Sequence, residues 1–263
     1  MPARTSLEIV RLAKPAAYLG YLFRELKHIM VPGVCSAEID AFCRHFLSER
    51  RMEPILEGYR GFPAAVCVSV NSVAVHGIPG SRTLENGDVV TVDVGAGYAG
   101  WKADAAWTYA IGTPTADGRR LIRAAWRSCC AGMRACRPGS RVGDIGAAVQ
   151  EAAISLGCSV VSQFLGHGIG REVHEPPAVP HVGTRGTGDR LQAGMVLNVE
   201  PVVTLGRPHV TLLDDGWSYV TSDGACAAQY ELTVALFAAS TRVLTVPELD
   251  LSDPGLDDWP PFC

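Results

Sequence analysis

The sequence lacks the features that mark membrane, secreted and nucleic-acid-binding chains. It has no apolar run of the roughly 18 residues that a membrane-spanning helix needs. Its first residues, MPARTSLEIVRLAK, contain no apolar stretch typical of a signal peptide. No long basic run occurs, and 23 basic against 27 acidic residues give a net charge of −4. We therefore expect a cytoplasmic chain with no membrane segment and no direct nucleic-acid site.

The cysteines exclude a second set of functions. There are nine, an odd number, at irregular spacing and with no CxxC pair, so neither a zinc knuckle nor a redox motif is indicated. Reduced and mostly buried thiols are expected instead. With 263 residues, 48% of them apolar, the chain can bury a large core as one large domain or two small ones.

Local patterns predict a mixture of helices and strands. A helix is expected over residues 5–30, with Leu7, Val10, Ala17 and Tyr21 on one side, and another from an N-cap at Ser36 to about residue 51. Strand-like sequence follows at 64–71 and 88–95. Helical sequence returns at 117–135 and at 141–156, the latter between a cap at Ser140 and a stop at Gly157. The acidic, proline-rich residues 246–263 are expected to form a surface tail.

The second half of the chain repeats the first. PGVCSAEI at 32–39 matches PGSRVGDI at 138–145, and LENGDVVTVD at 84–93 matches LQAGMVLNVE at 191–200. Two blocks in the same order at nearly one offset predict two related α+β halves about a pseudo-twofold axis. The alignment also places Asp93 opposite Glu200, so that two carboxylates face one axis.

Asp93 and Asp104 flank the glycine-rich segment VGAGYAGWKA, which predicts a hairpin. A turn centred on Tyr98 and Ala99 would pair the two aspartates directly, with Cβ atoms about 5 Å apart. Carboxylates that close repel each other unless a cation lies between them. The alternative is a solvated acidic hairpin with no ligand.

Three further polar residues stand alone in apolar or glycine-rich surroundings: His167 in FLGHGIG, Glu200 in LNVEP and Glu231 in AQYELTV. A lone histidine of this kind is often a hydrogen-bonded core residue, but glutamate is almost never buried without a partner. Four carboxylates and one imidazole would suit two ions such as Mn²⁺, Co²⁺, Fe²⁺ or Zn²⁺.

These blocks, together with VCVSVNSVAVHGIP, HGIGREVHEPP and LNVEPVV, resemble the signature segments of the methionine aminopeptidases across residues 5–245. The short interval between His174 and Glu200 resembles the type I enzymes of that family. The resemblance implies the α+β pita-bread fold, with two pseudo-twofold-related halves around a central antiparallel sheet and helices outside. It places the catalytic domain at residues 1–245, followed by the tail.

The resemblance also implies the roles of individual residues. Asp93 would bind one metal ion, Asp104 and Glu231 would bridge two, and His167 and Glu200 would complete the second site. Glu200 would also move the proton. His174 would stabilise the oxyanion and His76 would position the scissile amide, where each histidine alone could as well be structural.

A pocket for the methionine side chain is expected from Tyr59, Phe62, Cys67, Val173 and Trp217, since an apolar, aromatic and sulfur-containing cleft suits a thioether. Cys67 alone could equally be ordinary core. Among the positions that depart from the family, Leu232 replaces a usual histidine after the last glutamate, and Val173 replaces a usual aromatic residue. These departures predict weaker metal binding and a roomier pocket, and they suggest a divergent paralogue.

The expected substrate is the N-terminus of a peptide or nascent protein with a small second residue, with the ribosome as a candidate partner and the enzyme a monomer. Two rivals remain open. One is another pita-bread peptidase of the proline-dipeptidase kind, whose chains usually carry an extra N-terminal domain. The other is a non-catalytic binding protein on the same fold, although such relatives have typically lost metal ligands.

Overall fold

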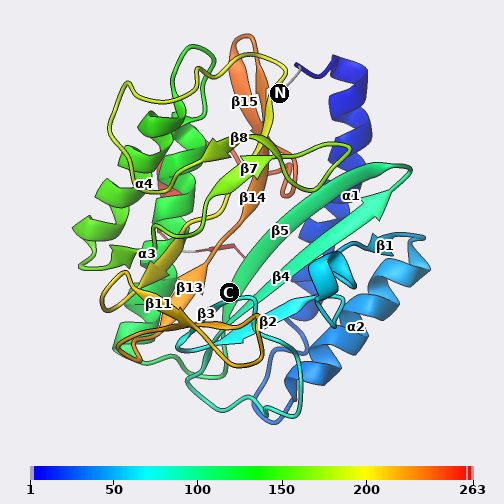
Figure 1. Cartoon of the computed structure of the whole chain (residues 1–263), viewed down its shortest axis with the longest axis vertical. Helices are drawn as coiled ribbons and strands as arrows, with labels where there is room; N and C mark the ends of the chain where they lie inside the picture. Colours follow the sequence, from blue (N-terminus) through cyan, green and yellow to red (C-terminus); the bar gives the residue numbers. More distant parts are fainter. Residues whose placement is uncertain (1–2, 259, 262–263) are drawn as a thin grey trace.

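The computed structural model describes residues 3–258 and 260–261. The chain has two similar halves, each with two helices followed by a series of strands (Figure 1). The helices are α1 (Ser6–Leu26), α2 (Ser36–Glu49), α3 (Ala116–Ala135) and α4 (Val142–Ser155), with single 3₁₀ turns η1 (Tyr59–Gly61) and η2 (Pro254–Asp257). The strands of the first half are β1 (Glu53–Pro54), β2 (Cys67–Val70), β3 (Val73–Val75), β4 (Val89–Tyr98) and β5 (Trp101–Ala110). Those of the second half are β6 (Ser159–Val160), β7 (Gly166–Gly168), β8 (Glu175–Val179), β9 (Val196–Val199), β10 (Val202–Thr204), β11 (Val210–Leu212), β12 (Tyr219–Thr221), β13 (Ala227–Gln229), β14 (Leu232–Phe237) and β15 (Ser240–Val243).

The predicted duplication is visible in the second helix of each half. Both α2 and α4 have 14 residues, and both begin with a carboxylate that accepts the N-cap amide: Glu38 from Cys35 and Asp144 from Arg141, each at 2.7 Å. The expected caps Ser36 and Ser140 are therefore wrong by one residue. Because the carboxylate in the first turn satisfies the N-cap amide and suits the helix dipole, a side-chain cap at the N-cap itself is not required.

Helix α1 buries a face other than the one that carries the apolar residues predicted to share one side. It begins with a capping box between Thr5 and Glu8 and ends at Leu26, four residues earlier than predicted. Leu7, Val10 and Tyr21, from the predicted stripe, are 60%, 66% and 52% exposed. The helix instead packs through a competing stripe of the same period, which is the bulkier of the two and comprises Ile9, Leu12, Ala16, Leu19, Leu22 and Phe23.

The long hairpin of β4 and β5 is the centre of the first half. Ala99 and Gly100 form its turn, with φ of 50° and 75°, because a tight two-residue hairpin turn needs positive φ at both positions. This turn lies one residue later than predicted and moves the register by two. Asp104 therefore pairs with Gly95, and Asp93 pairs with Ala106. The prediction that Asp93 lies directly opposite Asp104 is wrong, but the two remain diagonal neighbours on one face of the sheet.

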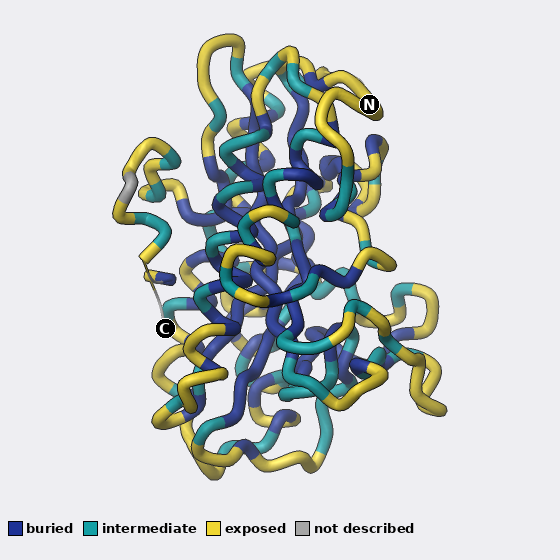
Figure 2. The backbone as a smooth tube through the Cα atoms, turned by 90° about the vertical axis from the view of Figure 1, so that its left-hand side faces the viewer, coloured by how far each residue is buried: buried dark blue, intermediate teal, exposed yellow. Residues whose placement is uncertain are grey.

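A backbone bridge at Ala106 and Glu231 links the two large sheets of the molecule. Ala106 of β5 donates to Glu231 at 3.2 Å and accepts from it at 2.9 Å, which joins the first sheet (β1, β2, β4, β5) to the second (β15, β14, β9, β7, β8). Helices α1 and α2 lie on one side of these strands and α3 and α4 on the other (Figure 1). The buried backbone runs through the middle of the molecule, with exposed loops at its ends (Figure 2).

The residues after 245 do not form a free tail. Trp126 of α3 donates its indole N–H to the carbonyl of Leu256 at 2.6 Å. Arg134 donates to the carbonyl of Leu251 at 2.8 Å and to Asp257 at 2.6 Å. These hydrogen bonds hold the described part of the segment along α3.

The described cysteines are mostly buried, as the sequence predicted. Eight cysteines lie among the described residues, all free and six of them buried, while Cys263 lies outside that part of the chain. Within the described ranges, none of the helices is long and apolar enough to cross a membrane.

Candidate metal centre

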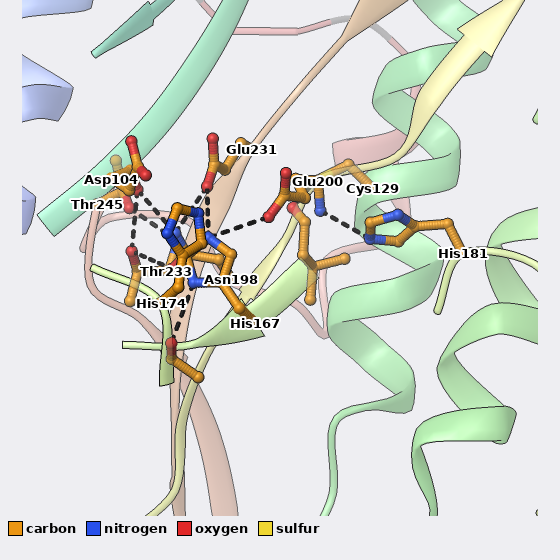
Figure 3. A network of polar contacts seen from close by, with 12 residues as sticks. Asp104, Cys129, His167, His174, His181, Asn198, Glu200, Glu231, Thr233 and Thr245 are labelled. Carbon is orange, nitrogen blue, oxygen red and sulfur yellow. Dashed lines mark hydrogen bonds and ion pairs between the residues drawn. The ribbon is translucent and has the colours of Figure 1, made fainter. Parts of the chain in front are cut away.

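The structure brings the five predicted metal ligands together at the junction of the two halves (Figure 3 shows four of them). The candidate donor atoms of Asp93, Asp104 and Glu231 lie within 4.8 Å of one another, and so do those of His167, Glu200 and Glu231. Glu231 belongs to both groups. Two overlapping donor sets with one shared carboxylate can hold two adjacent cations.

Strand register explains why residues distant in sequence meet here. Cys67 of β2 pairs with Asp93 of β4, Asp93 pairs with Ala106 of β5, and Ala106 bridges to Glu231. Laterally paired residues project to the same face of a sheet. Cys67, Asp93 and Glu231 therefore line one row across the molecule. Asp104 joins them from two positions further along β5.

The second half completes the row. Leu232 pairs with Val199, and the same register carried one residue further sets Glu231 opposite Glu200. His167 of β7 presents Nε2 to this pair, 3.3 Å from Glu200 and 3.9 Å from Glu231. Its Nδ1 lies 3.0 Å from the carbonyl oxygen of Gly168. A proton on Nδ1 makes that hydrogen bond and leaves the Nε2 lone pair free for a metal ion.

Burial sets the electrostatics of the centre. Desolvation raises the pKa of Asp93 to about 7, although a hydrogen bond from Asp104 acts in the opposite direction. Desolvation, followed by repulsion from neighbouring carboxylates, raises the pKa of Asp104, Glu200 and Glu231 well above the usual range. Desolvation also lowers the pKa of His167 to about 4. Bound cations would offset the repulsion among these buried carboxylates and favour their ionised forms.

Two buried oxygens also favour a bound cation. Among the described residues, Oδ1 of Asp104 and Oε1 of Glu200 have no hydrogen-bond partner. An unpaired buried carboxylate oxygen is costly in a protein interior, and a cation removes the cost. The residues present therefore fit divalent ions that take oxygen and imidazole ligands.

A hydrogen-bonded shell orients the ligands, and the sequence alone did not predict it. Asn198 donates to Glu231 at 2.7 Å, and Thr233 donates to Asn198 at 2.9 Å. His181 is buried, and its Nε2 accepts the backbone N–H of Glu200 at 3.1 Å. A single polar residue in an apolar strand, such as Asn198 in VLNVE, was the available signal.

The expected effect of Leu232 does not fit this geometry. Leu232 is fully buried in the main core, next to Glu231 in the strand and so on the opposite face. Asn198 supplies the hydrogen bond that orients Glu231. The Glu231 carboxylate thus keeps an orienting partner that does not depend on the residue at position 232.

Both predicted non-ligand histidines border the same cavity. Nδ1 of His174 lies 2.9 Å from the hydroxyl of Tyr59, and its ring packs edge-on against His167 at 4.3 Å between centroids. The donor atom of His174 is close enough to Asp104 and His167 to be grouped with them, although the family resemblance gives it no ligand role. His76, with a left-handed φ of 57°, lies edge-on to Trp217 and two other aromatic rings, those of Phe164 and Tyr219. Backbone strain of this kind is typical of functional positions.

The cavity has a volume of about 320 Å³ and combines the metal centre with an apolar wall. Four of the five predicted pocket residues line it: Tyr59, Phe62, Cys67 and Trp217. The exception is Val173, which is buried and whose backbone instead contacts His167, so its short side chain is not part of the lining. Leu56 and Arg60 also line the cavity and were missed, because neither belongs to a motif with recognisable chemistry.

A cavity with a multi-carboxylate, histidine-containing centre on a duplicated α+β scaffold defines a metal-dependent hydrolase class. The chain belongs to metallopeptidase family M24, whose model matches residues 12–236. It has the pita-bread fold of that family.

Individual relatives agree with this assignment. The chain is 40% identical to a methionine aminopeptidase of Clostridium perfringens, over 91% of this chain and 96% of the relative. The crystal structure of methionine aminopeptidase from Rickettsia prowazekii superposes with a TM-score of 0.92 at 31% identity, covering 93% of this chain and 99% of that one. Prolidase from Pyrococcus furiosus shares the fold alone, with a TM-score of 0.70 at 20% identity, over 92% of this chain and 65% of its own length.

Proposed function

We propose that this chain is a dinuclear methionine aminopeptidase that removes the N-terminal methionine from peptides and nascent proteins, with a preference for a small second residue. The observation that carries the proposal is the convergence of five metal donors with an apolar, aromatic wall in one cavity. The coverage and identity of the named relatives support it over the prolidase alternative. The complete donor set argues against a binding protein that has lost metal ligands.

Each of the two donor groups would bind one metal ion. Asp93, Asp104 and Glu231 would hold one divalent ion, and His167, Glu200 and Glu231 the other. When bound, such ions polarise a carbonyl group and make a water-derived nucleophile available near neutral pH. Co²⁺, Mn²⁺, Fe²⁺ and Zn²⁺ all suit the donor atoms.

The protein's own groups would move the proton and stabilise charge. Oε1 of Glu200, which has no hydrogen-bond partner among the described residues, can take a proton from the attacking water and deliver it to the leaving amine. The Tyr59 hydroxyl lies 2.9 Å from Nδ1 of His174, and by donating to that nitrogen it would leave the imidazole proton on Nε2. That N–H can donate to the oxygen on which negative charge develops.

The substrate's first residue would fill the cavity. Phe62 and Trp217 pack edge-on at 5.1 Å between centroids, and Cys67 lies beside Asp93 at the same wall. Aromatic rings and a thiol suit the polarisable thioether of methionine. His76 directly follows β3, borders the cavity and would hold the scissile amide.

The test is the release of methionine from Met-Ala and Met-Gly peptides by metal-free protein to which Mn²⁺, Co²⁺, Fe²⁺ and Zn²⁺ are added in turn. We expect release with at least one of these ions and none in EDTA. Hydrolysis of Ala-Pro but not Met-Ala would favour the proline-dipeptidase alternative. Absence of a stoichiometric metal pair, with no hydrolysis of either substrate, would favour the binding protein.

A further inference from the structure

The cavity lining contains one cation that the proposed chemistry does not use. Arg60 is exposed and borders the same cavity as the metal donors. Within the described part of the chain it forms no ion pair. The nearest carboxylate in the sequence, Glu57, is paired with Arg44 at 2.7 Å. The guanidinium of Arg60 is therefore available to a ligand.

The turn that carries Arg60 is built to hold it at the cavity. Arg60 has φ of 50° and ψ of 24°, a left-handed conformation that costs free energy for any residue with a Cβ. Backbone hydrogen bonds fix this turn: Gly58 donates to Phe62 at 2.8 Å, and Gly61 donates to Gly58 at 3.0 Å. The guanidinium carbon lies 5.4 Å from the ring centroid of Tyr59, which is the partner of His174.

Exposure locates Arg60 at the mouth of the cavity. Of the lining residues, Arg60 and His174 are the exposed ones. Under the proposed function, only the first residue of the substrate enters the cavity, and His174 lies at the scissile bond. The chain that follows the bond must leave through the mouth, past Arg60. The positive charge of Arg60 also lowers the pKa of His174, behind the larger effect of burial, as expected for a neighbouring cation.

On this basis, which rests on the proposed function, we propose that Arg60 is a specificity-determining residue that binds a carboxylate at the third or fourth residue of the substrate. The second residue is constrained to be small, so an acidic side chain first becomes available at the third. A guanidinium pairs with a carboxylate through a fork of parallel N–H donors, which gives direction as well as charge. Of the residues that line the cavity, Arg60 is the one with a permanent positive charge on its side chain.

The experiment compares kcat/KM for C-terminally amidated peptides that differ in one charge: Met-Ala-Glu-Ser, Met-Ala-Gln-Ser and Met-Ala-Lys-Ser, and the same series with the variable residue moved to the fourth position. The metal-loaded wild type is expected to prefer Glu over Gln by about 3- to 10-fold in one of the two series, the range for an ion pair at a partly exposed site. The preference should shrink as ionic strength rises. Amidation removes the terminal carboxylate as a competing ligand.

Arg60→Gln should abolish the Glu-over-Gln preference, and Arg60→Glu should reverse it in favour of Lys. Glutamine has a Cβ like arginine, so the left-handed backbone is strained to a similar degree in both. Arg11→Gln is the matched control, because Arg11 is an exposed arginine of α1 outside the cavity lining and its loss changes the net charge equally. The ratio between peptides is the readout, so a change in absolute rate does not affect the conclusion.

An equal Glu-to-Gln ratio in the wild type and Arg60→Gln would overturn the role of Arg60 while leaving the aminopeptidase intact. Failure of the wild type to release methionine from any of these peptides would instead overturn the proposed function. Loss of the preference for Glu to the same degree in Arg60→Gln and Arg11→Gln would assign the effect to overall charge and overturn a specific role of Arg60.

Discussion

The hydroxyl of Tyr59 lies 2.9 Å from Nδ1 of His174, on a turn that precedes β2, while His174 precedes β8 in the other half of the molecule. This contact ties an aromatic side of the cavity to the histidine that faces the metal centre. The backbone turn that carries Tyr59 is itself closed by hydrogen bonds. Tyr59 is thus suited to fixing both the orientation and the tautomer of His174, beyond its contribution to the apolar wall.

We expect Tyr59→Phe to lower kcat by about 3- to 10-fold, since a typical hydrogen bond contributes about 0.5–1.5 kcal/mol. The ring and its apolar contact remain, so KM for Met-Ala peptides and bound metal should change little. Tyr219→Phe, which removes the hydroxyl of a ring that packs against His76 rather than His174, is the matched control. A rise in KM with unchanged kcat would show that Tyr59 acts only as part of the pocket wall.

Asp104→Ala should abolish methionine release and reduce bound metal. Asp104 is buried, belongs to the first donor group, and has an oxygen with no hydrogen-bond partner among the described residues. Metal content by mass spectrometry and hydrolysis of Met-Ala with saturating Mn²⁺ are the measurements. Near wild-type turnover in this variant would mean that the centre has been assigned to the wrong residues.

His174→Ala should differ from Asp104→Ala in its metal content. It should retain metal while turnover falls by about 10²–10³-fold, the usual effect of losing an oxyanion donor. The comparison with His167→Ala makes the test specific, because the Nε2 of His167 faces Glu200 and Glu231 directly. His167→Ala should lose metal as well as activity. If both histidine variants lost metal equally, His174 would be a ligand, as its proximity to Asp104 and His167 allows.

The sequence predicted more of the fold than of the contacts within it. The offset repeat correctly predicted two halves, since α2 and α4 share length and capping chemistry. The hairpin register was wrong because the position of a turn within a glycine-rich segment depends on which residues adopt positive φ, and here Ala99 does so beside Gly100. The apolar side of α1 that the sequence indicated is largely exposed, because two apolar stripes of equal period compete on that helix and the other one packs against the core.

At the candidate site, the sequence motifs predicted the metal donors but not the residues that hold those donors in place. The local sequence does not show that Asn198 bonds to Glu231 or that His181 bonds to Glu200, because the two partners in each pair are distant in the sequence. It also does not show that Arg60 borders the cavity. Val173 was assigned to the pocket by its place in a motif, but the structure turns its backbone toward the centre.

Removing metal should make stability depend on pH. Asp93 has a folded-state pKa raised to about 7, above the usual value of about 3.9 for an unfolded aspartate. Its stabilising contribution to the free energy of unfolding is therefore complete below about pH 4 and is lost as pH rises through about 7. His167 and His181, with pKa values lowered to about 4, have the opposite slope between pH 4 and 6.5. Above pH 6.5 the carboxylates dominate, and the melting temperature in EDTA should fall as pH rises.

Metal should reverse that trend, because its ligands must be deprotonated to bind it. The rise in melting temperature on adding Mn²⁺ should therefore grow from pH 6 to pH 8. Asp93→Asn is the control: in EDTA its melting temperature should depend less on pH than that of the wild type, and Mn²⁺ should stabilise it less. Parallel pH curves for the two proteins in EDTA would contradict the placement of Asp93 in a buried, uncompensated cluster.

Substitutions at Asn198 and Leu232 distinguish which of these two positions supports Glu231. Asn198 is fully buried, donates to Glu231 at 2.7 Å and accepts from Thr233 at 2.9 Å. Asn198→Ala should weaken metal binding by about 10- to 100-fold, the usual effect of losing a group that orients a ligand. The metal concentration for half-maximal activity is the measurement. Leu232→His, which the family resemblance alone would favour as an improvement, should not lower that concentration, because the side chain at 232 faces the core.

Leu232→His should instead destabilise the fold, by about 1–3 kcal/mol for a polar group buried without a partner. The wild-type leucine packs there with no exposed surface. Denaturant unfolding in EDTA isolates this effect from metal binding, and Leu232→Met, a volume-conserving change, should cost less than about 1.5 kcal/mol. If Leu232→His tightened metal binding at unchanged stability, the core would have rearranged to bring position 232 to the metal centre, and Asn198 would not be the principal support of Glu231.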